Sequence, residues 1–223
     1  KSVFHEDKNR IKIGAGNDGQ KNINLKVTGA IDENDFISAT VSHREIDNNS
    51  RDNNDFYATQ VSIKHGHIFD DESTLETELS YTESNMNIPS TMTASEFETF
   101  KETGEQHNTS SQWQNSARDS KILALNTKYE KEVGAITYKP RFYFNTWEHF
   151  HPVTGMINDS SDNSVYGTDL ELNYDHKLFG NNAALVTGVT YKTDITNGAE
   201  KYEYADIDTI TKTPSYGPPI PYQ

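Results

Sequence analysis

The residues best suited to chemistry stand in the run WEHFHP, which holds Trp147, Glu148, His149 and His151. Two imidazoles and a carboxylate are ligands that transition metals accept. In an extended chain, however, His149 and His151 share one face while Glu148 points to the other. A zinc site normally takes three or four protein ligands. We therefore expect no metal here and interpret the two histidines as residues at the rim of a loop.

A second histidine pair stands in KHGH, from Lys64 to His67. His65 and His67 also share a face of an extended chain. They fall near a short turn, away from the long loops through which a ligand would arrive. We expect them to be interfacial strand residues without a function in binding.

Carboxylates are abundant, for example Glu76, Glu78, Asp169 and Glu171, and a carboxylate pair is the catalytic machinery of a glycosidase. Because acidic residues recur along many segments, no one pair stands out. The sequence contains no nucleophile elbow, zinc-protease motif or phosphate-binding loop. We therefore expect no catalytic residues, no cofactor and no enzymatic activity.

Charge and composition exclude several classes of protein. The net charge is -14, which argues against a nucleic-acid partner held through phosphates. The absence of cysteine excludes disulfides and thiolate metal sites. No apolar run is long enough for a transmembrane helix. A mean hydropathy of -0.83 is still compatible with a membrane barrel, because only alternate residues of a spanning strand face lipid.

Hydrophobic residues alternate with polar ones at the period of a β-strand in many segments. In YGTDLELNYD, for example, Tyr166, Leu170 and Leu172 fall on one face, while Asp169 and Glu171 fall on the other. The pattern predicts nine strands at about 10–17, 21–32, 36–46, 56–69, 73–83, 121–130, 134–149, 164–176 and 183–195.

After the first gap, short and long connections alternate strictly. The long ones lie around DNNSRDNND, over residues 84–120 and around HPVTGMINDSSDNS. An outer-membrane barrel has short periplasmic turns and longer extracellular loops in this alternation, and several of the strands are long enough for a tilted span. The sequence therefore predicts an all-β, antiparallel, up-and-down transmembrane β-barrel.

Three further features fit a barrel. Tyrosines stand near strand ends, as in an interfacial girdle: Tyr57, Tyr81, Tyr129, Tyr138, Tyr174 and Tyr191.

One short helix is expected in the longest, extracellular loop at 93–103, where Thr93 and Glu96 can form a capping box and Phe97 and Phe100 would pack against the barrel mouth. The segment 204–223 is rich in proline, which suits no central strand, and is expected to be an irregular loop segment.

The order of elements resembles the early barrel of a TonB-dependent outer-membrane receptor. The matching segments are RIKIGAG, KNINLKVTGAIDENDFISATVSHREID, FYATQVSIKHGHIFDDESTLETELSYTES, SVYGTDLELNYD and AALVTGVTYKTD before YEYADI. The resemblance implies a 22-stranded barrel closed by a plug domain in the outer membrane of a Gram-negative bacterium. It also implies energised uptake of a scarce solute, with energy relayed by the TonB complex through the plug. Ferric siderophores are the commonest ligand class in the family, with cobalamin and glycans as rivals that the sequence does not separate.

Two features depart from that family. The sequence shows no plug and no TonB-box segment, and it has about nine strands where the family has 22. We therefore expect residues 1–223 to be a partial outer-membrane barrel domain, an open curved sheet in contact with outer-membrane lipid that cannot transport by itself.

Ligand contacts in such a receptor come from the extracellular loops and the upper lumen, so the expected ligand-binding residues are Trp113, Trp147, His149 and His151. Two alternatives stay open: a soluble or secreted all-β binding module, and a smaller porin-like or adhesive outer-membrane barrel. A second layer of this chain enclosing Phe144, Leu170 and Leu172 would favour the soluble module.

Overall fold

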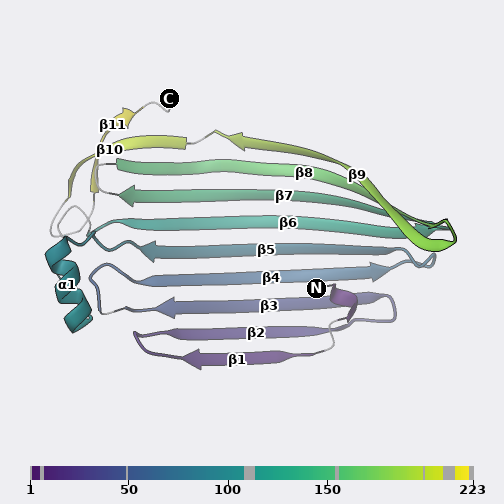
Figure 1. Cartoon of the computed structure of the whole chain (residues 1–223), viewed down its shortest axis with the longest axis horizontal. Helices are drawn as coiled ribbons and strands as arrows, with labels where there is room; N and C mark the ends of the chain where they lie inside the picture. Colours follow the sequence, from purple (N-terminus) through teal and green to yellow (C-terminus); the bar gives the residue numbers. More distant parts are fainter. Residues whose placement is uncertain are drawn as a thin grey trace.

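The chain folds into one antiparallel, 11-stranded sheet (Figure 1). The computed structural model describes residues 2–5, 8–48, 50–107, 114–153, 156–197, 199–207 and 214–220. The strands are β1 (Arg10–Ala15), β2 (Lys21–Ala30), β3 (Asp35–Ile46), β4 (Phe56–Ile68), β5 (Thr74–Asn87), β6 (Ala117–Val133), β7 (Ile136–Val153), β8 (Met156–Leu178), β9 (Asn181–Thr196), β10 (Ala199–Ile207) and β11 (Pro214–Ile220).

Each strand from β1 to β8 pairs with the next along the chain. Strands β9 and β10 share one neighbour: β9 pairs with Asn163–Leu178 of β8 and β10 with Met156–Ser160. β10 therefore continues the edge that β9 begins, and β11 pairs with β10. The result is the up-and-down meander expected from the sequence, in which all nine expected strands are present.

The connections separate into two ends of the sheet. At one end, called here the turn end, residues 31–34, 69–73, 134–135 and 179–180 join the strands. At the other, the loop end, the connections include 47–55 and 88–116. In the β8–β9 turn, Phe179 and Gly180 both have positive φ, at 50° and 82°, as a tight two-residue hairpin requires. The expected short connections at the turn end and two of the three expected long ones, 47–55 and 88–116, are confirmed.

One expected loop is in fact a pair of strands. The polar stretch around 150–163 was assigned to a connection of about fourteen residues, but β7 runs to Val153 and β8 begins at Met156. Residues 150–163 are mostly polar, as loops are, because this end of the hairpin extends past the apolar part of the outer face. Their backbone groups are nevertheless paired across the hairpin, for example Phe150 with Asp159, and such pairing satisfies them whatever the side chains are.

The tail also differs from expectation. An irregular segment was expected over 204–223, whereas β10 reaches Ile207 and β11 spans Pro214–Ile220; residues 208–213 and 221–223 of that segment lie outside the described residues. Proline removes a ladder donor and is therefore confined to edge strands or bulges. β11 satisfies that condition, because it has one partner, and its pairing with β10 shifts register twice.

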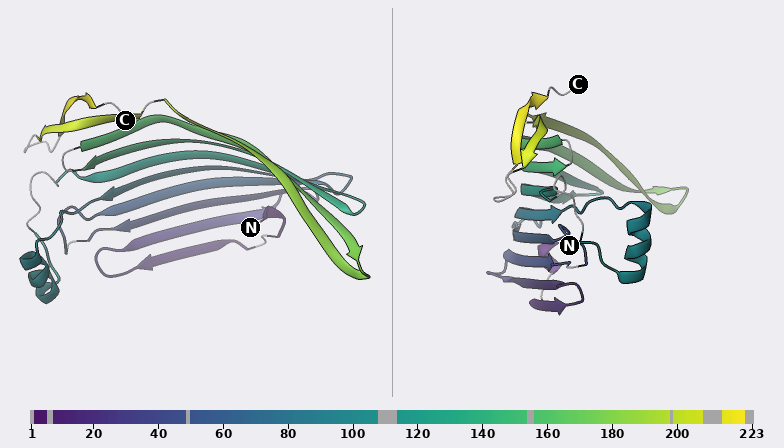
Figure 2. Two further views of the ribbon diagram at one scale, coloured as in Figure 1. Left: turned by 45° about the horizontal axis from the view of Figure 1, so that its top comes forward. Right: turned by 90° about the vertical axis from the view of Figure 1, so that its left-hand side faces the viewer.

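The sheet has two chemically different faces. The side on which the N-terminal 3-10 turn η1 (Val3–His5) lies is called here the inner face, and the sheet curls toward it at the β8–β9 hairpin (Figure 2). On β5, Glu76 and Glu78 point inward, since Val3 bonds Glu76, whereas Leu75 and Leu79 alternate with them. All six tyrosines of the expected girdle have the register of the outer face.

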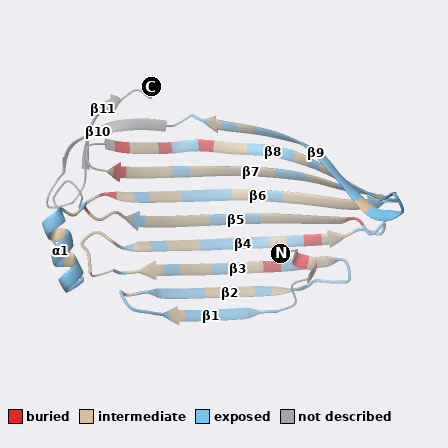
Figure 3. Cartoon of the chain, in the orientation of Figure 1, coloured by how far each residue is buried: buried red, intermediate tan, exposed pale blue. Residues whose placement is uncertain are grey.

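The outer face has no covering layer in the part of the chain that the structure describes. Buried apolar residues among those described are limited to Val3 and Ile157, and the buried positions lie mostly toward the two ends of the strands (Figure 3). Leu170 is 38% exposed and Phe142 46%. A soluble sheet buries one face against another layer, and the described residues do not supply the second layer over Leu170 that would have favoured the soluble module.

The apolar band of the outer face runs obliquely across the strands. Register places Ile23 of β2 in one row with polar outer-face residues of β3 to β7, among them Glu83 and Glu148. On β8 the apolar positions, such as Leu172 and Tyr174, lie several steps closer to the turn end. Strands of a membrane barrel tilt by about 35–45°, so a level band of lipid must cross their rows at an angle.

The expected helix is present as α1 (Ala94–Thr103), and its capping box is confirmed. The Glu96 backbone N–H donates to the Thr93 hydroxyl, and the Thr93 N–H donates to the Glu96 carboxylate. The expected packing of its rings is wrong: Phe97 is 50% exposed and no residue of α1 is buried. The described residues include no helix with the length and apolar character needed to cross a membrane.

The base of α1 is fixed by hydrogen bonds between the two long loops. The Arg51 guanidinium donates to the side-chain oxygen of Gln106 and to the Ser90 carbonyl, both at 2.8 Å. Asn53 donates its amide to the carbonyls of Ile88 and Ser116 at 2.9 and 2.8 Å. Gln106 and Ser90 are almost fully buried. These polar contacts hold the two loops together in place of an apolar core. The helix α1 stands clear of the sheet on its inner side (Figure 2).

Candidate ligand-binding site on the inner face

Trp147, His149 and His151 lie together on the inner face, at the loop end of β7. The ring centroids of Trp147 and His149 are 6.3 Å apart, and those of His149 and His151 are 5.5 Å apart in a stacked arrangement. His151 Nδ1 is 2.7 Å from the Ala117 carbonyl oxygen. Glu148 points to the outer face, where it approaches Lys121. The structure therefore brings together three of the four expected ligand residues, while Trp113 lies outside the described residues.

Arg118 of β6 joins this group and was not singled out in the sequence. Its Nε donates to His149 Nε2 at 3.2 Å, so that nitrogen accepts and the imidazole is neutral. At the level of His149, the outer face of β6 and β7 carries the charged residues Lys121 and Glu148, so this part of the two strands lies beyond the apolar band. Burial, followed by the charges of Arg118 and His151, holds the pKa of His149 below its usual value. The bond therefore orients a neutral ring toward the inner side.

A β-bulge in β8 positions the Trp147 end of the group. The register shifts between Trp147 and His149, which pair with Asn163 and Ser160. The Asn163 amide donates to the Trp147 carbonyl at 3.0 Å, and the Ser160 hydroxyl donates to the Asn163 side-chain oxygen at 2.9 Å. Asn163 is 1% exposed. Bulges bend a strand locally and redirect side chains, and here a buried asparagine holds the bend.

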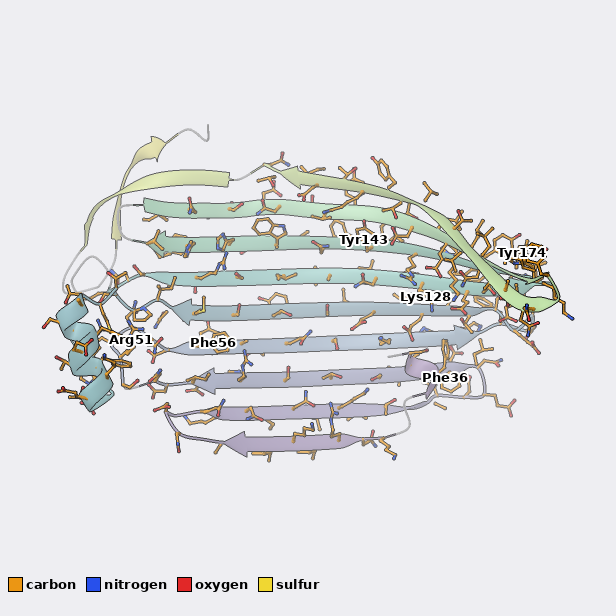
Figure 4. All side chains as sticks on the ribbon, in the orientation of Figure 1. Phe36, Arg51, Phe56, Lys128, Tyr143 and Tyr174 are labelled. Atoms are coloured by element: carbon orange, nitrogen blue, oxygen red, sulfur yellow. The ribbon has the colours of Figure 1, made fainter. Side chains whose placement is uncertain are left out.

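Small residues lie between His149 and a second arginine. Arg44 of β3 and His149 of β7 stand at the two ends of one inner-face row, and the Arg44 guanidinium lies 4.8 Å from the Phe56 ring centroid (Figure 4 labels Phe56). Within the described chain, neither Arg44 nor Arg118 is paired with a carboxylate. The side chains between the two ends are Ala58, Ser84 and Ser120.

Toward the turn end, the inner face carries paired charges. Lys64 lies 3.5 Å from Glu76 and 3.3 Å from Glu78. Lys139 lies 3.8 Å from Glu130 and 4.0 Å from Glu171. The pairs link adjacent strands and are called here the charge lattice; Figure 4 labels Lys128, which lies 2.8 Å from Glu130. Each of the carboxylates named here therefore lies within 4.0 Å of a lysine.

The N-terminal turn docks beside this lattice. The Val3 N–H donates to Glu76 Oε2 at 2.6 Å, and Val3 is 1% exposed. Phe4 meets Phe36 edge to face with centroids 5.4 Å apart (Figure 4 labels Phe36). A side chain at Gly66 would overlap Val3 and Phe4. A glycine is therefore required at this point of β4 for the turn to reach the sheet.

The second histidine pair lies on the outer face at the turn end. His65 Nε2 and His67 Nδ1 are 2.8 and 2.9 Å from the same oxygen of Asp35, and the His67 ring lies edge-on to Phe69. This is a small polar cluster at the border of the apolar band. It agrees with the interpretation of these histidines as interfacial strand residues.

The loop end of the inner face gathers aromatic and basic side chains. It combines a tryptophan face, two stacked imidazoles and two arginines without carboxylate partners. Arginine without such a partner suits carboxylate or other anionic groups, and the indole supplies a flat apolar surface. In the described residues, no three His, Asp or Glu side chains are arranged to share a metal ion.

Comparison with known sequences finds no matching family and no matching curated protein. Solved structures do match. The ferripyoverdine receptor of the outer membrane of Pseudomonas aeruginosa, bound to ferripyoverdine, has a TM-score of 0.76 at 13% identity and covers 100% of this chain and 33% of its own. The FpvAI complex with pyocin S2 has a TM-score of 0.69 at 13% identity, covering 94% of this chain and 30% of its own.

A third match is FpvA of P. aeruginosa bound to a heterologous pyoverdine with iron, with a TM-score of 0.68 at 12% identity, covering 96% of this chain and 32% of its own. This chain thus spans about a third of the length of the receptors it matches. At such low identity the likeness establishes the fold. The resemblance expected from the sequence, to part of the barrel of an outer-membrane receptor, is confirmed at that level.

Proposed function

We propose that this chain forms part of the barrel wall of a receptor in the outer membrane of a Gram-negative bacterium, which takes up a scarce solute. The complete barrel of 22 strands, the plug and the coupling to the TonB complex belong to this proposal. The chain's role is binding and passage, and we propose that it catalyses no reaction.

The observation that carries the proposal is the sheet's two-sided chemistry combined with its fold. An outer face with an oblique apolar band suits lipid, and an inner face of paired charges and small polar residues suits a wet interior. One matched structure is a receptor of the outer membrane, and its match covers 100% of this chain.

We propose a ferric siderophore as the ligand. Such complexes carry anionic or strongly polar groups around iron, for which Arg118 and Arg44 supply unneutralised donors. Trp147 offers a stacking surface at the same level of the wall. The receptors with similar structures are described with ferripyoverdine and with a heterologous pyoverdine, which supports this ligand class without identifying the molecule.

The test is uptake and binding by the full-length protein. Iron-limited cells that lack their other siderophore receptors should regain growth on at least one ferric siderophore when they produce it. Trp147→Ala and Arg118→Gln should each weaken binding of that complex about tenfold, the loss expected for one stacked ring or one charge-assisted hydrogen bond.

Lys131→Gln is the matched control, because Lys131 lies on the outer face of the same strand as Arg118 and pairs with Asp71 in a turn. It should bind like the native protein. Growth on no ferric siderophore would reject the ligand class. Unchanged binding by both inner-face variants would reject this patch as the binding surface.

A further inference from the structure

The outer face is hollowed at the loop end, just above the apolar band. A cavity of about 570 Å³ opens there. The residues that line it on the outer face include Tyr57, Asn85, Asp119, Lys121, Phe150 and Asp159. A neighbouring cavity of about 610 Å³ shares Asp119 and Phe150 with it and reaches the loop at 47–55. The two together make a polar groove, called here the collar groove. Most of its lining residues have the register of the outer face, and Ser84, Ser120 and His149 of the inner-face row also line the first cavity.

The apolar band begins directly below the collar groove. Lys121 and Glu83 line the groove, and two residues along the same strands stand Leu123 and Tyr81, which are 40% and 39% exposed. An occupant of the groove would therefore have a polar part among carboxylates and amides and an apolar part on the band. Such an occupant is an amphiphile lying along the wall.

The lining identifies the polar part. Two aromatic rings, Tyr57 and Phe150, stand among carboxylate and amide groups, and Asn85 donates to Asp119. Aromatic faces and carboxylate acceptors suit a ring that carries many hydroxyls and C–H groups. Four carboxylates line the 570 Å³ cavity, with Lys121 as its one lysine or arginine, and the 610 Å³ cavity adds Asp52 and Asp55. Lys121 lies 4.0 Å from Glu148, which leaves that ammonium able to meet one anionic group.

We propose that the collar groove binds the sugar headgroup of an outer-leaflet glycolipid whose acyl chains lie on the apolar band. This inference rests on the proposed location in the outer membrane. A phospholipid is disfavoured, because it has no sugar ring to occupy the space between Tyr57 and Phe150. The groove thus selects one lipid class at one height on the wall.

The experiment measures lipid retained by the full-length protein in detergent. Folded protein is incubated with an acylated diglucosamine glycolipid, phosphatidylethanolamine and phosphatidylglycerol in equal amounts, and native mass spectrometry counts the molecules that stay bound. The native protein should retain the glycolipid preferentially. Phe150→Ala, Tyr57→Ala and the isosteric Asp119→Asn should each reduce its retention about five- to tenfold, which corresponds to one lost contact.

Asp35→Asn is the control, since it changes a carboxylate on the same face at the turn end, away from the groove. It should retain the glycolipid like the native protein. Equal retention by all variants, or equal retention of the three lipids, would overturn the inference. Ferric-siderophore binding measured on the same preparations separates the two proposals: its loss with preferential glycolipid retention intact would count against the ligand class alone.

Discussion

The two faces of this sheet are built from the same strands but obey opposite rules. On the outer face, large apolar side chains such as Leu79 and Phe142 remain about half exposed, 49% and 46%, with nothing in the described chain to cover them. On the inner face, Lys64 and Lys139 each approach two carboxylates within 4.0 Å. A single residue step therefore changes the environment from apolar to ionic.

This difference implies two solvents on the two sides of a single layer. A soluble sheet protects one face with a second layer, whereas a membrane wall leaves its apolar face to lipid and needs no core of its own. Four substitutions test that contrast, from the largest expected effect to the smallest. The first compares matched positions on the two faces, and the other three probe the inner face.

A charge in the middle of the apolar band should have the largest effect. Val189 faces outward opposite Leu170, and Thr190 faces inward opposite Asp169. Val189→Arg should cost about 2–4 kcal/mol of stability in lipid, the range for a cation near the midplane of a membrane barrel. Thr190→Arg should change stability by less than about 0.5 kcal/mol, as surface substitutions generally do. Urea unfolding in vesicles measures both, and equal costs would remove the distinction between the faces.

The docking of the N-terminal turn should be the next most sensitive feature. Gly66→Val would displace Val3 from the inner face, with an expected loss of about 1–2 kcal/mol of apolar burial. Hydrogen exchange of the Val3 amide, now bonded to Glu76, should accelerate. Gly29→Val is the control, because a side chain there meets nothing within 4 Å. Unchanged protection of Val3 in the Gly66 variant would show that the turn docks elsewhere.

Reversing one charge should disturb the charge lattice. Lys139→Glu would place a third carboxylate beside Glu130 and Glu171, at an expected cost of about 1 kcal/mol for partly exposed charges. Adding Glu171→Lys should restore most of the loss. The loss should also shrink in 1 M salt, where screening acts over about 3 Å. A loss unaffected by salt would point to packing instead of charge.

Protonation of His149 should give the smallest effect. Its pKa in the folded chain lies below the usual value, so an unfolded chain takes up the proton first as the pH falls. Local stability at the loop end should therefore be constant above about pH 6.5, the ordinary value for histidine, and fall below it. His149→Gln should remove that fall. Hydrogen exchange of the β7–β8 hairpin at pH 7.5 and pH 5.5 measures it, and a loss retained in the variant would assign it to another group.

Much of the fold follows from the alternation of residue types. All nine expected strands, the short turns and α1 with its cap are present, because period-two runs and capping residues act locally. Expectation failed where polar residues continue a strand, as in the β7–β8 hairpin beyond Glu148, since backbone pairing there needs no apolar face. It also failed for Phe97, whose packing depended on loop geometry that no local pattern encodes.

The candidate site was predictable in part. Trp147, His149 and His151 were expected from their place at the loop end of a strand, and the structure brings them together on one face; their role in binding stays a prediction. Arg118 was missed because it fell in residues assigned to the long loop, whereas β6 begins at Ala117. Arg44 lay inside an expected strand, but its relation to His149 requires the register of five strands. Extending the alternating pattern of β6 backward would have found Arg118.

The most direct test of the account places a spin label at Leu79 and, separately, at Ser80 of β5 in the full-length protein. The sequence has no cysteine, so each single-cysteine variant can be labelled cleanly in vesicles. The Leu79 label should be accessible to oxygen dissolved in the lipid and protected from a water-soluble nickel chelate, and the Ser80 label should show the reverse preference. Equal accessibility at the two positions, or a Leu79 label shielded from both reagents, would contradict a wall between hydrocarbon and a wet interior.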